Sequence, residues 1–126
     1  MNRTVFPTLE ETLYLHTRLI EEFGGESGVR DLGLLESALA RPRSGYYQSL
    51  SLQAAALMQS LASNHAFVDG NKRMAFALTA IFFQLNNYIL RVDAKEAERF
   101  IVKDIIAAHA EVTLIAAWLE KYVSEI

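Results

Sequence analysis

The sequence predicts an all-α protein, a compact antiparallel bundle of about six helices in a single domain spanning all 126 residues. Three observations predict this class. Apolar residues recur at helical spacing nearly throughout, start and stop signals separate these stretches, and two consecutive stretches are apolar on all sides. Helices without a polar face belong in the interior, so these two are expected at the centre. The 52% of apolar residues suffices for one hydrophobic core.

The first helix is predicted from both of its ends. Thr8 and Glu11 form a capping-box signature, and Gly24-Gly25 ends the helical spacing that follows. His16 falls on the apolar stripe of this helix, so we interpret it as a core histidine and assign it no chemical role.

The later helices are delimited by similar signals. Pro42 stops the second helix, Asn86-Asn87 ends the fourth, and Asp93 with Glu96 resembles a capping box that opens the fifth. The stretch 41–51 is predicted to be a loop rich in turn and aromatic residues. The helices expected after the first cover residues 31–40, 51–64 and 71–86, a stretch from Asp93 and, after a break at 109–113, a last stretch through Trp118.

Composition and charge argue against several classes of protein. A net charge of −3 disfavours broad electrostatic binding to DNA or RNA, so no direct contact with nucleic acid is expected. The absence of Cys excludes disulfides and thiolate metal sites and fits a reducing compartment. Met1-Asn2-Arg3-Thr4 is not an apolar export segment, and the apolar run 74–83 is too short to span a membrane. We therefore expect a cytoplasmic protein without membrane contact.

Most of the candidate chemistry lies in one run, His65-Ala66-Phe67-Val68-Asp69-Gly70-Asn71-Lys72-Arg73. It leads into a predicted helix start, where free backbone N–H groups favour an anion such as phosphate, and Lys72 and Arg73 add positive charge there. Asp69 supplies a carboxylate suited to Mg²⁺ that also binds phosphate oxygens. His65, four residues earlier, is placed to accept a proton from an incoming hydroxyl at neutral pH.

Taken singly, these residues have ordinary alternatives: a surface histidine, an Asp-Gly-Asn turn and a solvated basic pair. The whole run resembles the signature of the Fic/Doc family, His-x-Phe-x-Asp/Glu-Gly/Ala-Asn-Gly/Lys-Arg, at every fixed position. The resemblance implies that His65 is a general base, that Phe67 anchors the loop in the core, and that Asp69 holds Mg²⁺. It also implies that the nucleotide phosphates are bound by Gly70, Asn71, Lys72 and Arg73.

Two positions bear on which reaction the resemblance implies. Adenylylating Fic enzymes carry a second Gly where this chain has Lys72, and a second Arg, which orients the nucleotide for AMP transfer, where it has Phe76. The Asn-Lys-Arg ending is similar to the death-on-curing (Doc) branch, toxins of bacterial toxin–antitoxin pairs, although Doc proteins often have Ala in place of Gly70. The similarity extends to residues 23–25 and 34–42.

Three functions follow as alternatives. The first is an ATP-dependent, Mg²⁺-requiring kinase toxin that phosphorylates a Ser or Thr hydroxyl of a target protein and so inhibits translation; the Doc resemblance suggests elongation factor Tu as that target. The second is an AMP transferase of the Fic type, and the third is an inactive member that only binds partners.

Two further expectations concern partners and the surroundings of the site. The resemblance implies control by an antitoxin of the Phd type, whose disordered segment folds along a groove of the toxin. The loop around Tyr46 and Tyr47 is a candidate flap over the nucleotide and the target, ordinary aromatic packing being the alternative.

Overall fold

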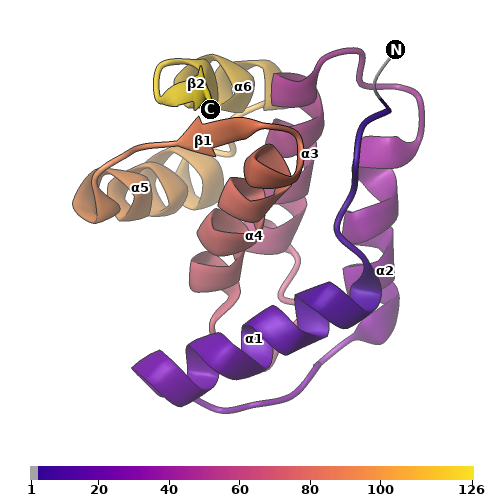
Figure 1. Cartoon of the computed structure of the whole chain (residues 1–126). Coiled ribbons are helices and arrows are strands. Elements are labelled where there is room, and N and C mark those ends of the chain that lie inside the picture. The colour runs from indigo at the N-terminus through magenta and orange to yellow at the C-terminus, as the bar shows by residue number, and fades with distance from the viewer. Residues whose placement is uncertain (1–2) are drawn as a thin grey trace.

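The computed structural model describes residues 3–126 (Figure 1). This part of the chain contains six α-helices, a 3₁₀-helix, a π-helix and two short strands, joined by loops. In chain order they are α1 (Leu9–Phe23), α2 (Leu32–Ala40), the 3₁₀-helix η1 (Arg41–Arg43), α3 (Leu50–Ser63), α4 (Asn71–Leu85), β1 (Tyr88–Leu90), α5 (Ala94–Arg99), the π-helix η2 (Phe100–Ala107), α6 (Val112–Glu120) and β2 (Val123–Glu125). The predicted all-α class is therefore confirmed. The expectation that the chain does not start with an export segment concerns Met1-Asn2-Arg3-Thr4. Of these residues, Met1 and Asn2 lie outside the described part of the chain.

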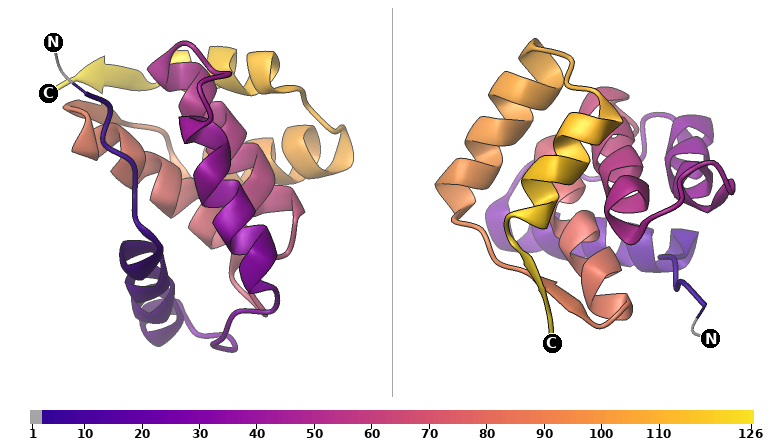
Figure 2. Two further views of the ribbon diagram at one scale, coloured as in Figure 1. Left: turned by 90° about the vertical axis from the view of Figure 1, so that its right-hand side faces the viewer. Right: turned by 90° about the horizontal axis from the view of Figure 1, so that it is seen from above.

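The centre of the molecule is the antiparallel pair of helices α3 and α4 (Figures 1 and 2). Every residue of α3 from Ala54 to Met58 is fully buried, which is more than one complete turn of that helix. On α4 no residue between Met74 and Phe83 is exposed. The predicted central pair is confirmed. Within residues 3–126 none of the helices combines the length and the apolar character needed to cross a bilayer.

The first helix forms as its sequence signals predict. The Thr8 hydroxyl accepts a hydrogen bond from the Glu11 N–H at 3.1 Å, and the Glu11 carboxylate accepts one from the Thr8 N–H at 2.8 Å. Gly24, at a φ of +86°, ends the helix and donates its N–H to the Ile20 carbonyl at 2.8 Å. Helix α1 crosses the end of the molecule at which α3 and α4 are joined (Figure 1).

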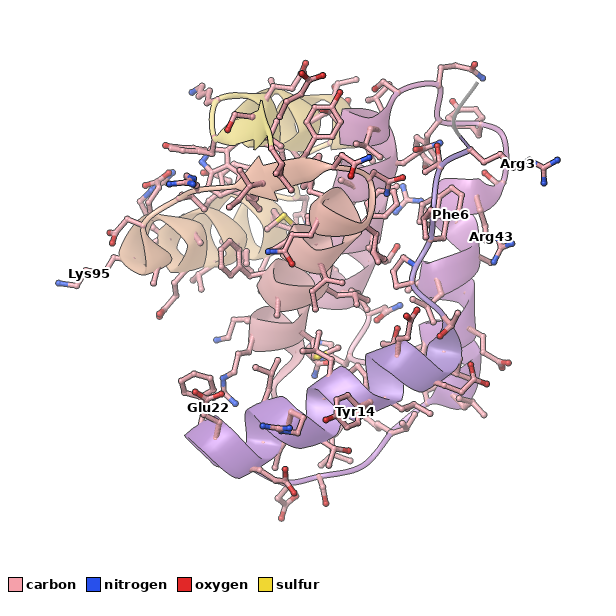
Figure 3. The ribbon with its side chains drawn as sticks, viewed as in Figure 1. Arg3, Phe6, Tyr14, Glu22, Arg43 and Lys95 are labelled. Carbon is pink, nitrogen blue, oxygen red and sulfur yellow. The ribbon has the colours of Figure 1, made fainter. Side chains whose placement is uncertain are left out.

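The segment before α1 is packed along α4. The ring of Phe6 stacks on Phe82 with 5.5 Å between centroids, and the Arg43 guanidinium lies 5.5 Å from the centre of the Phe6 ring (Figure 3). Asn86 exchanges two hydrogen bonds with the backbone of Val5, at 2.8 Å and 2.9 Å. The N-terminal segment therefore lies beside the C-terminal end of α4 before the chain enters α1.

Two strands depart from the purely helical prediction. β1 and β2 pair as an antiparallel two-stranded sheet, with Ile89 opposite Ser124. Each strand has three residues, too few for an alternating pattern to identify in a sequence. The left-handed turn at Asn87, with a φ of +69°, directs the chain into β1 after α4.

The capping box predicted at Asp93 and Glu96 does not form, because the Asp93 side chain makes no capping hydrogen bond. The Glu96 carboxylate instead accepts hydrogen bonds from Arg99, at 2.7 Å and 2.8 Å, and from the Trp118 indole N–H at 2.9 Å. These partners hold the end of α5 against α6. The predicted break before the last helix is confirmed: His109 has a φ of +55°, and α6 begins three residues later.

The Glu96 cluster is expected to make stability depend on acid. Hydrogen bonds from Arg99 and Trp118 lower the pKa of Glu96 from its ordinary 4.5 to about 2. The stabilisation by the ionised carboxylate is therefore complete above pH 4.5 and is lost as the pH falls toward 2. As the pH is lowered between these values, the free energy of unfolding should fall more steeply for the wild type than for Glu96→Gln. Urea denaturation at each pH measures this free energy. The exposed Glu98→Gln variant should follow the wild type; equal slopes for Glu96→Gln and wild type would contradict the expected role.

Candidate functional site

The loop that joins α3 to α4, residues 64–70, is here called the motif loop, and the connection between α1 and α2, residues 24–31, is called the strap. The strap lies along the motif loop like an added strand. Val68 donates its backbone N–H to the Gly28 carbonyl at 3.1 Å, and Val29 forms an antiparallel bridge with Phe67. The Ala66 carbonyl accepts N–H bonds from two further strap residues, at 2.8 Å and 3.0 Å. The strap therefore fixes the path of the motif loop.

The apolar centre of the motif loop is Phe67, which is 1% exposed. Its ring stacks on the imidazole of His16 with 3.9 Å between centroids and 10° between planes. His16, itself 3% exposed, donates from Nε2 to the Asp69 carbonyl at 2.8 Å. Phe67 thus lies in the core as the resemblance implied, and the buried His16 that the apolar stripe predicted also holds the backbone of the motif loop.

The side chain of Asn71 hydrogen-bonds to the backbone of the same loop. Its Nδ2 donates to the Phe67 carbonyl at 3.0 Å, and its Oδ1 accepts the Phe67 N–H at 3.0 Å. Both polar atoms of the amide are therefore used to shape the loop. What Asn71 offers to an anion is its backbone N–H at the start of α4.

The start of α4 is open to an anion. Gly70 precedes it at a φ of +79° and provides no side-chain cap, and the first helical bond runs from the Met74 N–H to the Gly70 carbonyl. Within residues 3–126 no hydrogen bond uses the backbone N–H of Asn71, Lys72 or Arg73. These N–H groups and the exposed Lys72 side chain make the start of α4 positively polarised.

Arg73, in the first turn of α4, lies against the end of α1. Its Nη1 donates to the Gly24 carbonyl at 3.2 Å, and its guanidinium lies 5.4 Å from the centre of the exposed Phe23 ring. A cation is favoured at this carboxyl-terminal end of α1 by the helix dipole. The structure therefore brings Arg73 next to the site, with one of its donors used by Gly24, the residue that caps α1.

Asp69 presents an exposed carboxylate two residues before the start of α4. Its Oδ2 accepts the Glu26 N–H at 3.2 Å and its Oδ1 accepts the Gly70 N–H at 2.8 Å. These two bonds, with a smaller contribution from the positive charge of Arg73, lower the pKa of Asp69. The carboxylate is therefore ionised at neutral pH.

The Asp69 carboxylate suits Mg²⁺, which the family resemblance implied. Each carboxylate oxygen accepts one backbone hydrogen bond and keeps lone-pair capacity for a hard cation. In the described part of the chain no three His, Cys, Asp or Glu side chains are grouped so that they could hold a metal. A Mg²⁺ ion bound at Asp69 would therefore complete its coordination with water and phosphate oxygens.

His65 opens the motif loop from a left-handed conformation, with a φ of +53°. Its side chain is exposed, and its backbone carbonyl accepts a hydrogen bond from Nε of Arg30 at 2.6 Å. Sequence reasoning did not identify Arg30. A single arginine in a connection between two helices carries no signal that distinguishes it from an ordinary surface residue.

The structure does not support the predicted flap at Tyr46 and Tyr47. The loop that carries them precedes α3, whereas the motif loop follows it, so about 20 Å of helix lies between the two (Figure 1). The Tyr47 hydroxyl accepts a hydrogen bond from Arg41 at 2.8 Å, and the two tyrosine rings pack edge to face. Tyr47 packs as the alternative interpretation expected, whereas Tyr46 is 80% exposed. The segment that lies against the motif loop is the strap.

Together these groups define a class of protein: an all-α scaffold whose central helical hairpin presents an imidazole, an ionised carboxylate and an open helix start in one loop. The chain belongs to the Fic/DOC family, whose family model matches residues 6–83, a stretch that contains the strap and the motif loop. The family resemblance carried by the motif is thereby confirmed.

A curated relative supports the same placement. The chain is similar to the protein named Toxin Doc of Mycolicibacterium smegmatis (strain ATCC 700084 / mc(2)155), with 51% identity over 76 residues. The match covers 56% of this chain and 58% of that relative, so it spans less than two thirds of the relative's length. This similarity supports the predicted resemblance to the Doc branch.

Proposed function

We propose that this protein is the toxin of a toxin–antitoxin pair and that it transfers the γ-phosphate of ATP to a Ser or Thr hydroxyl of a target protein. The observation that carries the proposal is the open start of α4, where uncapped N–H groups and Lys72 adjoin the ionised Asp69 carboxylate. A polyphosphate is the ligand class that suits such a site. The similarity to Toxin Doc supports the biological role.

The chemistry assigns one task to each group. A target hydroxyl oxygen forms a bond to the γ-phosphorus, the bond from that phosphorus to the bridging oxygen breaks, and ADP leaves. His65 accepts the hydroxyl proton, while the α4 N–H groups and Lys72 stabilise charge on the phosphoryl oxygens. Asp69 would hold Mg²⁺, which supplies further charge neutralisation when it is bound.

Phe76 favours phosphate transfer over AMP transfer. Adenylylating members carry a second arginine here, but in this structure Phe76 is half-buried and packs against the core. Its apolar ring offers no charge to orient the α-phosphate. The proposed reaction therefore takes place at the γ-phosphate.

The proposal extends to the partners. Elongation factor Tu is the proposed target, so the protein would act in the cytoplasm and inhibit translation. We further propose an antitoxin of the Phd type as the neutralising partner, bound through a segment that folds on the toxin. No contact with nucleic acid or membrane is required for this activity.

The deciding experiment supplies Mg²⁺ and ATP labelled at either the α- or the γ-phosphate, together with purified elongation factor Tu or a bacterial lysate. Label transferred only from the γ-position is the expected result. Label transferred only from the α-position would replace the proposal with AMP transfer. No transfer to any protein from either position would favour an inactive binding module.

The close approach of the strap to Asp69 yields a prediction for Gly25. A Cβ added at Gly25 would lie 2.7 Å from the Asp69 Oδ2, so Gly25→Ala should displace that carboxylate. We expect the Mg²⁺ concentration that half-saturates transfer to rise about tenfold or more, measured by titrating Mg²⁺ at fixed ATP.

Gly24→Ala is the matched control for this prediction. Both glycines have positive φ values, +86° at Gly24 and +113° at Gly25, so both substitutions carry backbone strain. Only at Gly25 would the added Cβ meet Asp69, since nothing lies within 4 Å of a Cβ at Gly24. Equal Mg²⁺ dependence in the two variants would show that contact with Asp69 is not the cause.

A further inference from the structure

Arg30 contacts the backbone of the motif loop at the proposed general base. Its Nε donates to the His65 carbonyl at 2.6 Å, and its Nη2 reaches the Asn64 carbonyl at 3.3 Å. We propose that Arg30 is a positioning residue that sets the orientation of the His65 imidazole for phosphoryl transfer. This inference rests on the proposed function, because it assigns Arg30 a role in that reaction.

The backbone at His65 needs such a constraint. A φ of +53° is uncommon for a residue with a side chain, because the left-handed region crowds Cβ against the backbone. Such a conformation persists where the surrounding structure holds it. α3 ends at Ser63, so the carbonyls of Asn64 and His65 lie beyond the helix, where no helical N–H can bond to them.

The guanidinium of Arg30 suits this task better than other side chains would. It is planar, always charged and carries several donors, so one group can bond to two successive carbonyls. Its positive charge also lies at the carboxyl-terminal end of α3, where the helix dipole favours a cation. Both contacts are to backbone oxygens, so Arg30 acts on His65 by fixing the turn and takes no part in proton transfer.

In the described part of the chain, two other side chains from outside the motif loop bond to its backbone, and both act at other residues. His16 bonds to the carbonyl of Asp69, and Asn71 bonds to both backbone groups of Phe67. Among residues 3–126 the one side chain that donates to the backbone of His65 is Arg30. Loss of Arg30 should therefore disturb His65 while leaving Phe67 and Asp69 in place.

The test compares Arg30→Ala and Arg30→Lys with the wild type and with Arg18→Ala, which removes an exposed arginine of α1 outside the site. In Arg30→Ala, kcat for transfer should fall at least tenfold while the KM for ATP stays within about twofold. Arg30→Lys keeps the charge but replaces the planar guanidinium, which reaches both carbonyls from two nitrogens, with a single nitrogen, so it should recover part of kcat. If Arg30→Ala had the same kcat as the Arg18→Ala control, the proposal would be overturned. An increase in the KM for ATP without a change in kcat would also overturn it.

A second measurement does not depend on activity. The chain has three histidines, so the imidazole Cε1–H signals of His16, His65 and His109 can be assigned by substitution in NMR spectra of the protein. In both Arg30 variants the His65 signal should shift or broaden, while that of His109 stays unchanged. An unchanged His65 signal would overturn the proposal even if Arg30→Ala fails to fold and only Arg30→Lys is measured. If the wild type transfers no phosphate but the His65 signal shifts as expected, the proposed function fails and the structural role of Arg30 stands.

Discussion

Replacing His65 with alanine is expected to abolish detectable phosphoryl transfer while the protein remains folded. In the described residues the imidazole of His65 takes part in no hydrogen bond, and its side chain is exposed, so its removal leaves no cavity. General-base catalysis typically contributes between about 10² and 10⁴ in rate. We therefore expect transfer of γ-label to fall at least about 100-fold, with thermal unfolding near that of the wild type.

His109→Ala is the matched control for this experiment. Like His65, His109 is an exposed histidine with a positive φ, +55° against +53°, so both substitutions carry the same backbone cost. His109 lies in the turn before α6, outside the motif loop. His109→Ala should transfer phosphate at the wild-type rate, and a fully active His65→Ala protein would refute the general-base assignment.

Features encoded by neighbouring residues could be predicted from the sequence. The capping box at Thr8 and the glycine stop at Gly24 act within one helix turn, and both form as expected. The buried hairpin of α3 and α4 follows from composition alone, because helices without a polar face must lie inside. The motif loop between them was recognised because its residues are consecutive.

Features that depend on pairing between distant segments could not be predicted. The strap reaches the motif loop across more than thirty residues, so nothing near Arg30 indicates its bond to His65. The strands β1 and β2 likewise form by pairing with each other, and they lie far apart in the sequence. At Glu96 a local signal was present and failed, because Arg99 and Trp118 bind the carboxylate that the capping box requires.

Phe67→Ala is expected to cost about 3–5 kcal/mol of folding free energy, the range typical of a buried Phe truncated in a core. The ring is 1% exposed and stacks on His16, so its removal leaves a cavity and takes away the packing partner of the His16 imidazole. The loss should be measured by urea denaturation at equilibrium. Transfer activity should fall as well, because the backbone of the motif loop is anchored by this side chain.

Val68→Ala provides the neighbouring control. Val68 is 46% exposed, and its backbone N–H bond to the Gly28 carbonyl is kept when the side chain is shortened, so Val68→Ala should change the free energy of unfolding by less than about 0.5 kcal/mol. A Phe67→Ala protein as stable as Val68→Ala would contradict the anchoring role. Phe67→Ala and His65→Ala together separate two causes of inactivity. Phe67→Ala should lose activity together with stability, because Phe67 supports the loop. His65→Ala should lose activity alone, because its proposed role is in the chemistry and not in the packing.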